Sequence, residues 1–500
     1  MILKNRLTQF TAHPIDKAAL SLIGILTGAI AVLAGGNVLC GQSENCWLTN
    51  RPKVSHFSWQ DREIGATDRA FILTFDRPMD KASVEKNLTI NPSLPGKISW
   101  AGRKMAYTLT RPVPYGEKYQ LDLAKAREHF YGNDRQGQKM QPFQGNFQSR
   151  DRAFAYIGTQ GVEAGRLIFY NLTQQKKTIL TPSGLNVIDF KFYDNGKAIL
   201  FSAADKSLGF DGLRQLQLYR LPISLNPAYF SDTKPTLILD NKDYQNNQFD
   251  VTADGETLVV QRINRQNPGD FDLWMLQEKQ EPQPMKVTGG DFKIAPDSQS
   301  LAIARGEGIS ILPLQPEGKP LDFLPKFGQL LNFSPDGTAA AVINYNTDNA
   351  QKRYQRSLFY VNNQGQQREL FRTEGSILSC QFTSDNRQLY CLLTELLPGE
   401  SYQERPYFAQ IDVKTGKVTP LVALADYQDT KISLAPDGLG ILFDQVVVSQ
   451  DNQTNSSLTT SSGSAVVSGK LWLLIPPTTP GKLPELQELP LVGFRPQWLP

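Results

Sequence analysis

Histidine is scarce in this 500-residue sequence, and its positions limit the chemistry available to the chain. The three histidines are His13, His56 and His129, so residues 151–500 contain none. A Ser-His-Asp triad requires an imidazole, and metal sites with nitrogen ligands require histidine too. We therefore assign no catalytic residue and no metal ligand. No GxxxxGK[ST] loop for phosphate is present either, and we expect no cofactor.

Two carboxylates alternate in a loop that contains proline and glycine, at Asp270 and Asp272. Paired carboxylates serve as acid and base in glycosidases, and alternating carboxylates also bind calcium. Such residues in a Pro-Gly loop are usually solvated, which is the simpler interpretation here.

Two other segments, 352–356 and 402–407, combine arginine with tyrosine, which are favoured residues of binding interfaces. A solvated polar rim is the alternative interpretation. The candidate binding residues are Arg353, Tyr354, Arg356, Tyr402, Arg405 and Tyr407.

The charge balance excludes one class of partner. The chain has 52 Lys+Arg against 49 Asp+Glu, a net charge of +3 at pH 7. Nucleic-acid-binding domains carry a concentrated basic patch, and we therefore expect no nucleic-acid partner.

The four cysteines form two close pairs, Cys40 with Cys46 and Cys380 with Cys391. The second pair flanks a turn at 384–387, which would place the two residues opposite each other on antiparallel strands and near disulfide reach. We predict disulfides at both pairs, which fits an oxidising compartment. Two small apolar strand residues are the alternative at 380 and 391.

An uncharged apolar segment at 18–39 has the length of a membrane-spanning helix, about 20 residues. Lys4, Arg6 and Lys17 precede it, so the positive-inside rule predicts a cytoplasmic tail at 1–17, a single span at 18–39 and an exported remainder beginning with a linker at 40–53. Ala29 and Ala31 also fit a signal-peptide cleavage site, which leaves removal of the segment as the alternative.

Residues 54–150 show short strands separated by turns, for example 70–75, 105–109 and 118–123, and predict a β-sandwich. The segments TFDRPMD, YGEKY and FQGNFQS resemble the bacterial Ig-like domain of surface-layer and other envelope proteins. That resemblance implies a spacer or adhesion module and a bacterial cell envelope.

The remainder, 151–500, carries a degenerate repeat: an apolar-polar-apolar strand, a turn similar to Ser-Pro-Asp-Gly, and a second apolar strand. Spacings of 39 to 60 residues between turn aspartates are close to the period of β-propeller blades, roughly 40–50 residues. Asp and Gly suit such turns for local reasons, so we interpret the aspartates as turn formers. They are Asp194, Asp254, Asp297, Asp336, Asp385 and Asp437.

A seventh repeat is divided between the two ends of this region. Residues 494–499 resemble a first strand without its turn, and the segment from Asp151 resembles a blade without its first strand. Pairing of 494–499 with 154–157 would close the ring and protect both sheet edges. The predicted fold is thus all-β: a transmembrane helix, an Ig-like sandwich and a seven-bladed propeller at 151–500. The repeats resemble TolB-like and WD40-like propellers.

The enlarged connections all fall between the second and third strand of a blade, at 205–215, 264–271, 344–356, 395–406 and 449–469. Equivalent connections leave one face of a propeller, where binding usually resides. We predict a membrane-anchored, exported, non-enzymatic binding or scaffold protein of the bacterial inner membrane, with a protein or glycan of the envelope as partner. A carbohydrate-active enzyme using carboxylates of the central channel, and a purely structural spacer, are the alternatives.

Overall fold

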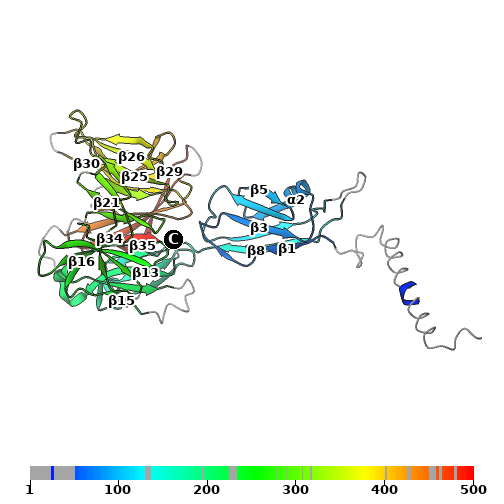
Figure 1. Ribbon diagram of the computed structural model, residues 1–500, viewed down its shortest axis with the longest axis horizontal. Coiled ribbons are helices and arrows are strands. Elements are labelled where there is room, and N and C mark those ends of the chain that lie inside the picture. Colours follow the sequence, from blue (N-terminus) through cyan, green and yellow to red (C-terminus); the bar gives the residue numbers. More distant parts are fainter. Residues whose placement is uncertain are drawn as a thin grey trace, which may run out of the picture.

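The computed structural model contains two β-rich parts, drawn from blue to cyan and from cyan to red in Figure 1. The described residues are 24–27, 51–129, 137–193, 196–223, 234–278, 280–288, 290–306, 308–315, 318–399, 402–424, 429–449, 458–460, 464–477 and 481–500.

Most of the predicted anchor falls outside these ranges. Residues 24–27 form a helical turn, and the other residues of 1–50, with Cys40 and Cys46, are outside the described residues. Within the described ranges, no helix combines the length and apolar character needed to cross a membrane. The span at 18–39 stays a prediction from sequence.

The first β domain consists of two four-stranded sheets that enclose one core. Alternation of side chains along the strands explains this arrangement, since Phe71, Leu73 and Phe75 are buried whereas Ala70 and Ile72, which alternate with them, are exposed. One sheet has the order β1 (Val54–Phe57), β3 (Ala70–Phe75), β6 (Lys104–Leu109), β5 (Gly96–Ala101), and the other β2 (Glu63–Ile64), β8 (Phe143–Ser149), β7 (Lys118–Leu123), β4 (Leu88–Asn91).

A short helix, α2 (Lys81–Asn87), interrupts this domain and was not expected from the sequence. The Asp80 side chain caps it by accepting a hydrogen bond from the Ser83 amide. Val84 is its buried residue, so α2 covers one end of the sandwich core.

In the described part of 151–500, five separate four-stranded antiparallel sheets and one seven-stranded sheet follow one another. The four-stranded sheets, each a blade, are β12 (Leu185–Phe192), β13 (Ala198–Asp205), β14 (Gln217–Pro222), β15 (Thr236–Leu239); β16 (Tyr244–Val251), β17 (Thr257–Asn264), β18 (Phe271–Gln277), β19 (Gln283–Pro284); β20 (Phe292–Ile294), β21 (Ser300–Arg305), β22 (Gly308–Pro313), β23 (Asp322–Pro325); β24 (Gln329–Phe333), β25 (Ala339–Asn344), β26 (Arg356–Asn362), β27 (Gln367–Thr373); and β28 (Ile377–Phe382), β29 (Gln388–Leu396), β30 (Glu404–Asp412), β31 (Val418–Ala423).

The seven-stranded sheet joins the two ends of the ring. Its members, in spatial order, are β11 (Lys176–Ile179), β10 (Leu167–Asn171), β9 (Ala153–Gly158), β35 (Glu485–Trp498), β34 (Val466–Ile475), β33 (Ile441–Val448) and β32 (Ile432–Leu434). The first half of β35 pairs with β34, and its second half pairs with β9, with Phe494 opposite Ile157 and Trp498 opposite Phe154. This is the pairing that the sequence predicts for closure, and it gives seven four-stranded units.

The first strands of successive units contact one another, β16 with β20, β20 with β24, and onward through β28, β32 and β35 to β12. Sequential sheets whose first strands surround a common axis form a β-propeller. The short 3-10 helices η1 (Gly161–Glu163) and η2 (Lys206–Arg214) lie in connections between second and third strands.

The repeated turns are built as the sequence predicts. The carboxylate of Asp336 accepts hydrogen bonds from the Thr338 amide and the Ser334 hydroxyl, which outweigh partial burial and lower the pKa of Asp336 to about 2. The next residue, Gly337, has φ of 70°. The other described turn aspartates, each accepting from the amide two residues later, are Asp254, Asp297, Asp385 and Asp437.

Strand direction defines two faces of the propeller. The turn face carries the aspartate turns between first and second strands, and the loop face carries the connections between second and third strands. The first β domain contacts the turn face: the Arg69 guanidinium donates to the Ser384 carbonyl at 2.8 Å, and the Tyr115 amide donates to Asp437 Oδ2 at 3.1 Å. The described residues of the enlarged connections therefore leave the propeller on the side opposite the first β domain, and most of 449–469 lies outside the described residues.

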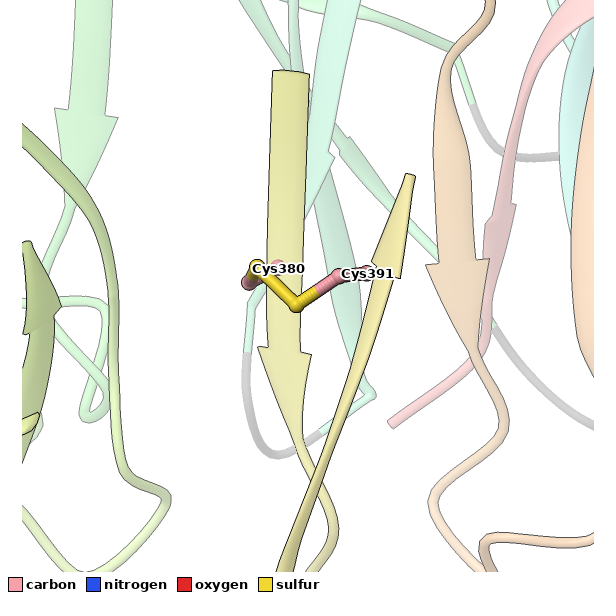
Figure 2. The surroundings of a disulfide bond; sticks show 2 residues. All are labelled: Cys380 and Cys391. Carbon is pink, nitrogen blue, oxygen red and sulfur yellow. A yellow bond between two sulfur atoms is a disulfide. The ribbon is translucent and has the colours of Figure 1, made fainter. Parts of the chain in front are cut away.

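Cys380 and Cys391 lie opposite each other on β28 and β29, in the register that the flanking turn predicts. Their sulfur atoms are bonded, as Figure 2 shows. Both residues are buried in the core of blade β28–β31, so this bridge links the first two strands of one blade.

Candidate functional site

Each innermost strand places one polar side chain between two apolar ones that are buried or half-buried, and these seven side chains form a belt around the propeller axis. We call this set the channel belt. Its members are Lys191, Asp250, Lys293, Asn332, Gln381, Ser433 and Gln497.

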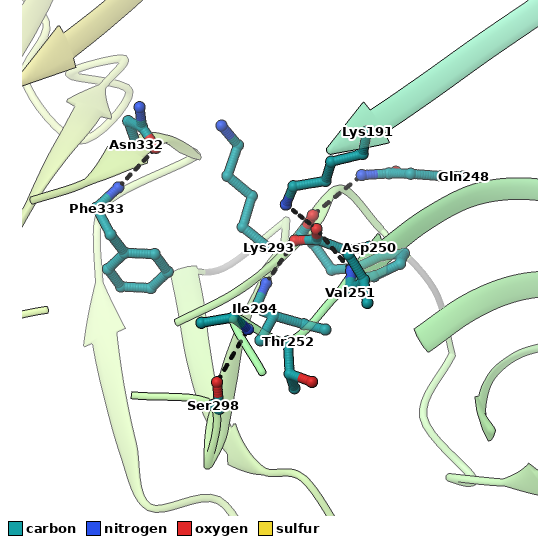
Figure 3. Close-up of polar contacts among 12 residues, drawn as sticks. Lys191, Gln248, Asp250, Val251, Thr252, Lys293, Ile294, Ser298, Asn332 and Phe333 are labelled. Atoms are coloured by element: carbon teal, nitrogen blue, oxygen red, sulfur yellow. Dashed lines mark hydrogen bonds and ion pairs between the residues drawn. The ribbon is translucent and has the colours of Figure 1, made fainter. Parts of the chain in front are cut away.

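Three belt residues, Lys191, Asp250 and Lys293 (Figure 3), link four neighbouring blades. Lys191 forms an ion pair with Asp250 Oδ1, and Asp250 Oδ2 accepts a 2.8 Å hydrogen bond from the Ile294 amide. Lys293 donates at 2.7 Å to the Leu331 carbonyl of the following blade. Burial and the nearby Lys191 lower the pKa of Lys293 to about 8, although Asp250 opposes this shift.

The remaining belt residues continue the pattern, apart from Asn332, which caps the amide of its own neighbour Phe333. The contacts to the next blade are Gln381 to the Ile432 carbonyl and Leu434 amide, Ser433 to the Trp498 amide, and Gln497 to the Phe190 carbonyl. The belt thus satisfies buried backbone groups between blades, which is a structural role.

A second carboxylate near the innermost strands, that of Asp444, is fully buried. Burial raises the pKa of Asp444 to about 6, against hydrogen bonds that it accepts from the amides of Arg495 at 2.6 Å and Lys431 at 2.7 Å. Like Asp250, it bridges separate strands.

The structure gives Asp270 and Asp272 separate local roles. Asp270 accepts from the Asn264 side chain at 2.9 Å within the loop. Asp272 accepts from the amides of Leu273 and Val287, and burial raises its pKa in spite of those hydrogen bonds. No metal-binding group of three or more His, Cys, Asp or Glu residues occurs among the described residues.

A cleft of about 560 Å³ opens at the loop end of blade β28–β31. The segment after β27 forms one wall, the β29–β30 hairpin a second, and the outer strand β31 a third. The lining residues are Thr373, Glu374, Thr394, Glu395, Leu396, Arg405, Tyr407, Pro420, Leu421, Val422 and Ala423. Pockets that bind small molecules have volumes of about 300–1,000 Å³.

Two of the candidate binding residues from the sequence, Arg405 and Tyr407, line this cleft. Arg405 forms a 2.9 Å ion pair with Glu395, and both side chains are about half exposed. Tyr407 is half-buried, and burial together with the charge of Glu395 raises the pKa of its hydroxyl.

Arg356 and Tyr402 lie beside the cleft in a network around Glu404. Glu404 accepts hydrogen bonds from the hydroxyls of Tyr402, Thr394 (2.7 Å) and Ser376 (3.0 Å). Burial opposes ionisation of Glu404, but these three donors outweigh it and lower its pKa. Arg356 donates to the Glu374 carbonyl at 3.2 Å.

Arg353 and Tyr354 are not among the lining residues. The Arg353 guanidinium lies 4.7 Å from the centre of the Tyr354 ring, and the Tyr354 side chain is 70% exposed. The structure therefore divides the six candidates into two that line the cleft, two beside it and two on an exposed connection.

Sequence reasoning missed Glu374, Glu395 and the β31 wall. Glu374 follows the outer strand of the preceding blade, about 30 residues before Arg405, and no local pattern marks it. The available signal was indirect: 374–376 is an inter-blade connection and so reaches the loop face.

Comparisons with known proteins add little. No family model and no curated protein matches this sequence. Among solved structures, the chain is similar to TolB from Acinetobacter baumannii (12% identity, 83% of each chain, TM-score 0.39) and to oligogalacturonate lyase from Vibrio parahaemolyticus (12% identity, 59% of this chain and 87% of that chain, TM-score 0.43). It is also similar to a hypothetical selenium-binding protein from Sulfolobus tokodaii (12% identity, 70% and 93%, TM-score 0.44). Similarity this weak carries no information on activity, and the propeller assignment rests on sheet order and ring closure.

Proposed function

We propose that this protein is a membrane-anchored, exported, non-enzymatic binding protein of the bacterial cell envelope. In this proposal residues 18–39 hold the chain in the inner membrane, and the first β domain is an Ig-like spacer. The seven-bladed propeller binds a protein or glycan of the envelope through its loop face.

The cleft beside Arg405 and Tyr407 is the observation that carries this proposal. It lies on the loop face, whereas the first β domain contacts the turn face through Arg69 and Tyr115. A chain tethered at its N-terminus would thus present the cleft away from its tether. Enlarged connections on one face of a rigid scaffold are also a common way to build a binding surface.

Two observations support the compartment. The cations before residue 18 and the uncharged segment 18–39 favour export of everything that follows. The bonded pair Cys380 and Cys391 fits an oxidising environment, because disulfides persist outside the cytoplasm.

Crosslinking from living cells tests the proposal. Photo-crosslinking groups placed in the full-length chain at Gln403 and Asn349, on two loop-face connections, should capture envelope components. Matched positions on the turn face, at Glu256 and Lys414, are the control. Shortening of 395–406 should reduce capture from Asn349, and shortening of 344–356 should reduce capture from Gln403; undiminished capture in both cases would contradict the proposal.

A second candidate function is a carbohydrate-active enzyme that uses channel carboxylates. It is favoured by the perturbed Lys293 beside Asp250, because shifted pKa values gather at active sites. It is opposed by the engagement of both Asp250 oxygens in contacts within the ring. Glycan turnover that disappears in Asp250→Asn, while the variant keeps wild-type thermal stability, would replace the binding proposal with this one.

A further inference from the structure

We infer that the cleft of blade β28–β31 takes a basic side chain, lysine or arginine, exposed on a partner protein. This inference rests on the proposed function and narrows it to one partner class. It follows from the charge of the rim, the apolar character of the floor and the form of the β31 wall.

The charged side chains at the rim are two carboxylates and one guanidinium. Arg405 pairs with Glu395. Glu374 is exposed, and the charge of the Arg356 guanidinium, which donates to the Glu374 carbonyl, is offset by the nearby Glu404. The rim therefore carries an excess negative charge, and a cationic group would complement it. The half-buried ring of Tyr407 offers a cation a further favourable contact.

Part of the lining is apolar, namely the half-buried side chains of Leu396 and of Leu421 and Val422 on β31, and we call these three residues the floor. A small inorganic cation gains nothing from such a floor. Lysine and arginine combine an alkyl stem with a terminal charge, so the stem can cover the floor while the charge reaches the rim. The volume of about 560 Å³ leaves room for neighbouring residues of a peptide segment.

The third wall, β31, is the outer strand of its blade, and such edges can bind an extended peptide as an added strand. Pro420 lies within β31 and lacks an amide hydrogen, and the register is broken between Pro420 and Val422. These features oppose strand addition. Recognition through an inserted side chain is therefore favoured over backbone pairing.

Arg405 distinguishes this inference from binding of a glycan or an acidic peptide. If the partner is basic, Arg405→Gln releases Glu395 from its ion pair with Arg405 and makes that carboxylate available to the partner. Binding should then strengthen by up to about fivefold, which corresponds to the free energy of one exposed ion pair. If the ligand hydrogen-bonds to the guanidinium, the same substitution weakens binding. Glu374→Gln should weaken binding of a basic partner, and Glu485→Gln, an exposed change on β35, is its matched control.

The probe is a set of immobilised hexapeptides of glycine, serine and alanine whose central position is lysine, arginine, alanine, glutamate or acetyl-lysine. Binding of the purified full-length chain in detergent is measured on each. We expect lysine and arginine to exceed alanine and acetyl-lysine by at least about tenfold, a difference of roughly 1.4 kcal/mol. Glu374→Gln should reduce this preference, Arg405→Gln should increase it, and Glu485→Gln should leave it unchanged.

Three results would overturn the inference: equal binding of lysine and acetyl-lysine peptides, weaker binding after Arg405→Gln, or competition by free butylammonium as strong as by the lysine peptide. The last would indicate a site for small amines. Far-ultraviolet circular dichroism of each variant checks that it is folded. If envelope proteins are captured but bind independently of Glu374, this inference alone fails. If capture does not depend on the loops at all, the proposed function fails.

Discussion

Closure of the ring by β35 makes a quantitative prediction about Phe494. Its side chain is 2% exposed and belongs to a core that includes Ile157 and Phe169 of its own blade and Phe190 of the next. Phe494→Ala should cost about 3–5 kcal/mol, the range for buried phenylalanine replaced by alanine. Because this core lies where the two ends of the propeller meet, the loss should appear as local opening of the seam between β35 and β9.

Hydrogen exchange measured by mass spectrometry on the full-length chain can follow this opening. A cost of about 3–5 kcal/mol corresponds to exchange faster by roughly two to four orders of magnitude. Amides of 493–499 and of the β9 residues that pair with them should show it, whereas those of blade β20–β23 should not. Val492→Ala, at a position 36% exposed on the same strand, is the control and should change exchange little.

Two results would refute the reasoning. Exchange at 493–499 within tenfold of the wild type would mean that Phe494 does not secure the seam. Equal acceleration in β20–β23 would mean that the ring unfolds as one unit, so that the seam is no weaker than the rest.

Other predictions concern the belt, the bridge and the joint between domains. In the folded protein the pKa of Lys293 is lowered to about 8 from 10.5, so burial of its charge lowers stability fully below pH 8, and this cost disappears as the pH rises to about 10.5. Across that pH range, thermal melts should show the free energy of unfolding of the wild type rising by up to about 3 kcal/mol relative to that of Lys293→Met. Replacement of both Cys380 and Cys391 by alanine should lower the free energy of unfolding by about 3 kcal/mol, from the separation of 11 residues, as read by urea denaturation. Arg69→Ala removes the 2.8 Å hydrogen bond from the Arg69 guanidinium to the Ser384 carbonyl across the joint, so small-angle scattering should show a wider distribution of distances between the two domains; an unchanged profile would mean that other contacts fix the joint.

Local rules explain which features could be predicted from the sequence. The turn around Asp336 needs five consecutive residues, and its hydrogen bonds to Ser334 and Thr338 lie within them, so the motif can be recognised in the linear sequence. The further hydrogen bond from the Asn386 side chain depends on the next blade. The register of Cys380 and Cys391 follows from the same kind of turn. Closure through 494–499 was predictable because a strand without its turn and a blade without its strand complement each other.

Features that depend on ring geometry were not predictable. The sequence shows a polar residue at Lys293 between two apolar ones, but its acceptor, the Leu331 carbonyl, depends on how the next blade is placed. The cleft similarly unites Glu374 with β31, segments about 45 residues apart. No periodic pattern in the sequence predicts that these segments lie together, because each segment shows only the usual residue pattern of its own strand.

The positions of the joint and the cleft on opposite faces of the propeller follow from the direction of its strands. Each first strand ends at the turn face, so an aspartate that builds a turn is also exposed to a docking domain, and Asp437 serves both the Leu439 amide and the Tyr115 amide. Each second strand ends at the loop face, where Glu395 and Leu396 line the cleft. Strands of about six residues separate the faces by roughly 20 Å, since each residue advances about 3.3 Å. A partner bound in the cleft, as we propose, would thus be held beyond contact distance of the joint, and its binding would not require release of the first β domain.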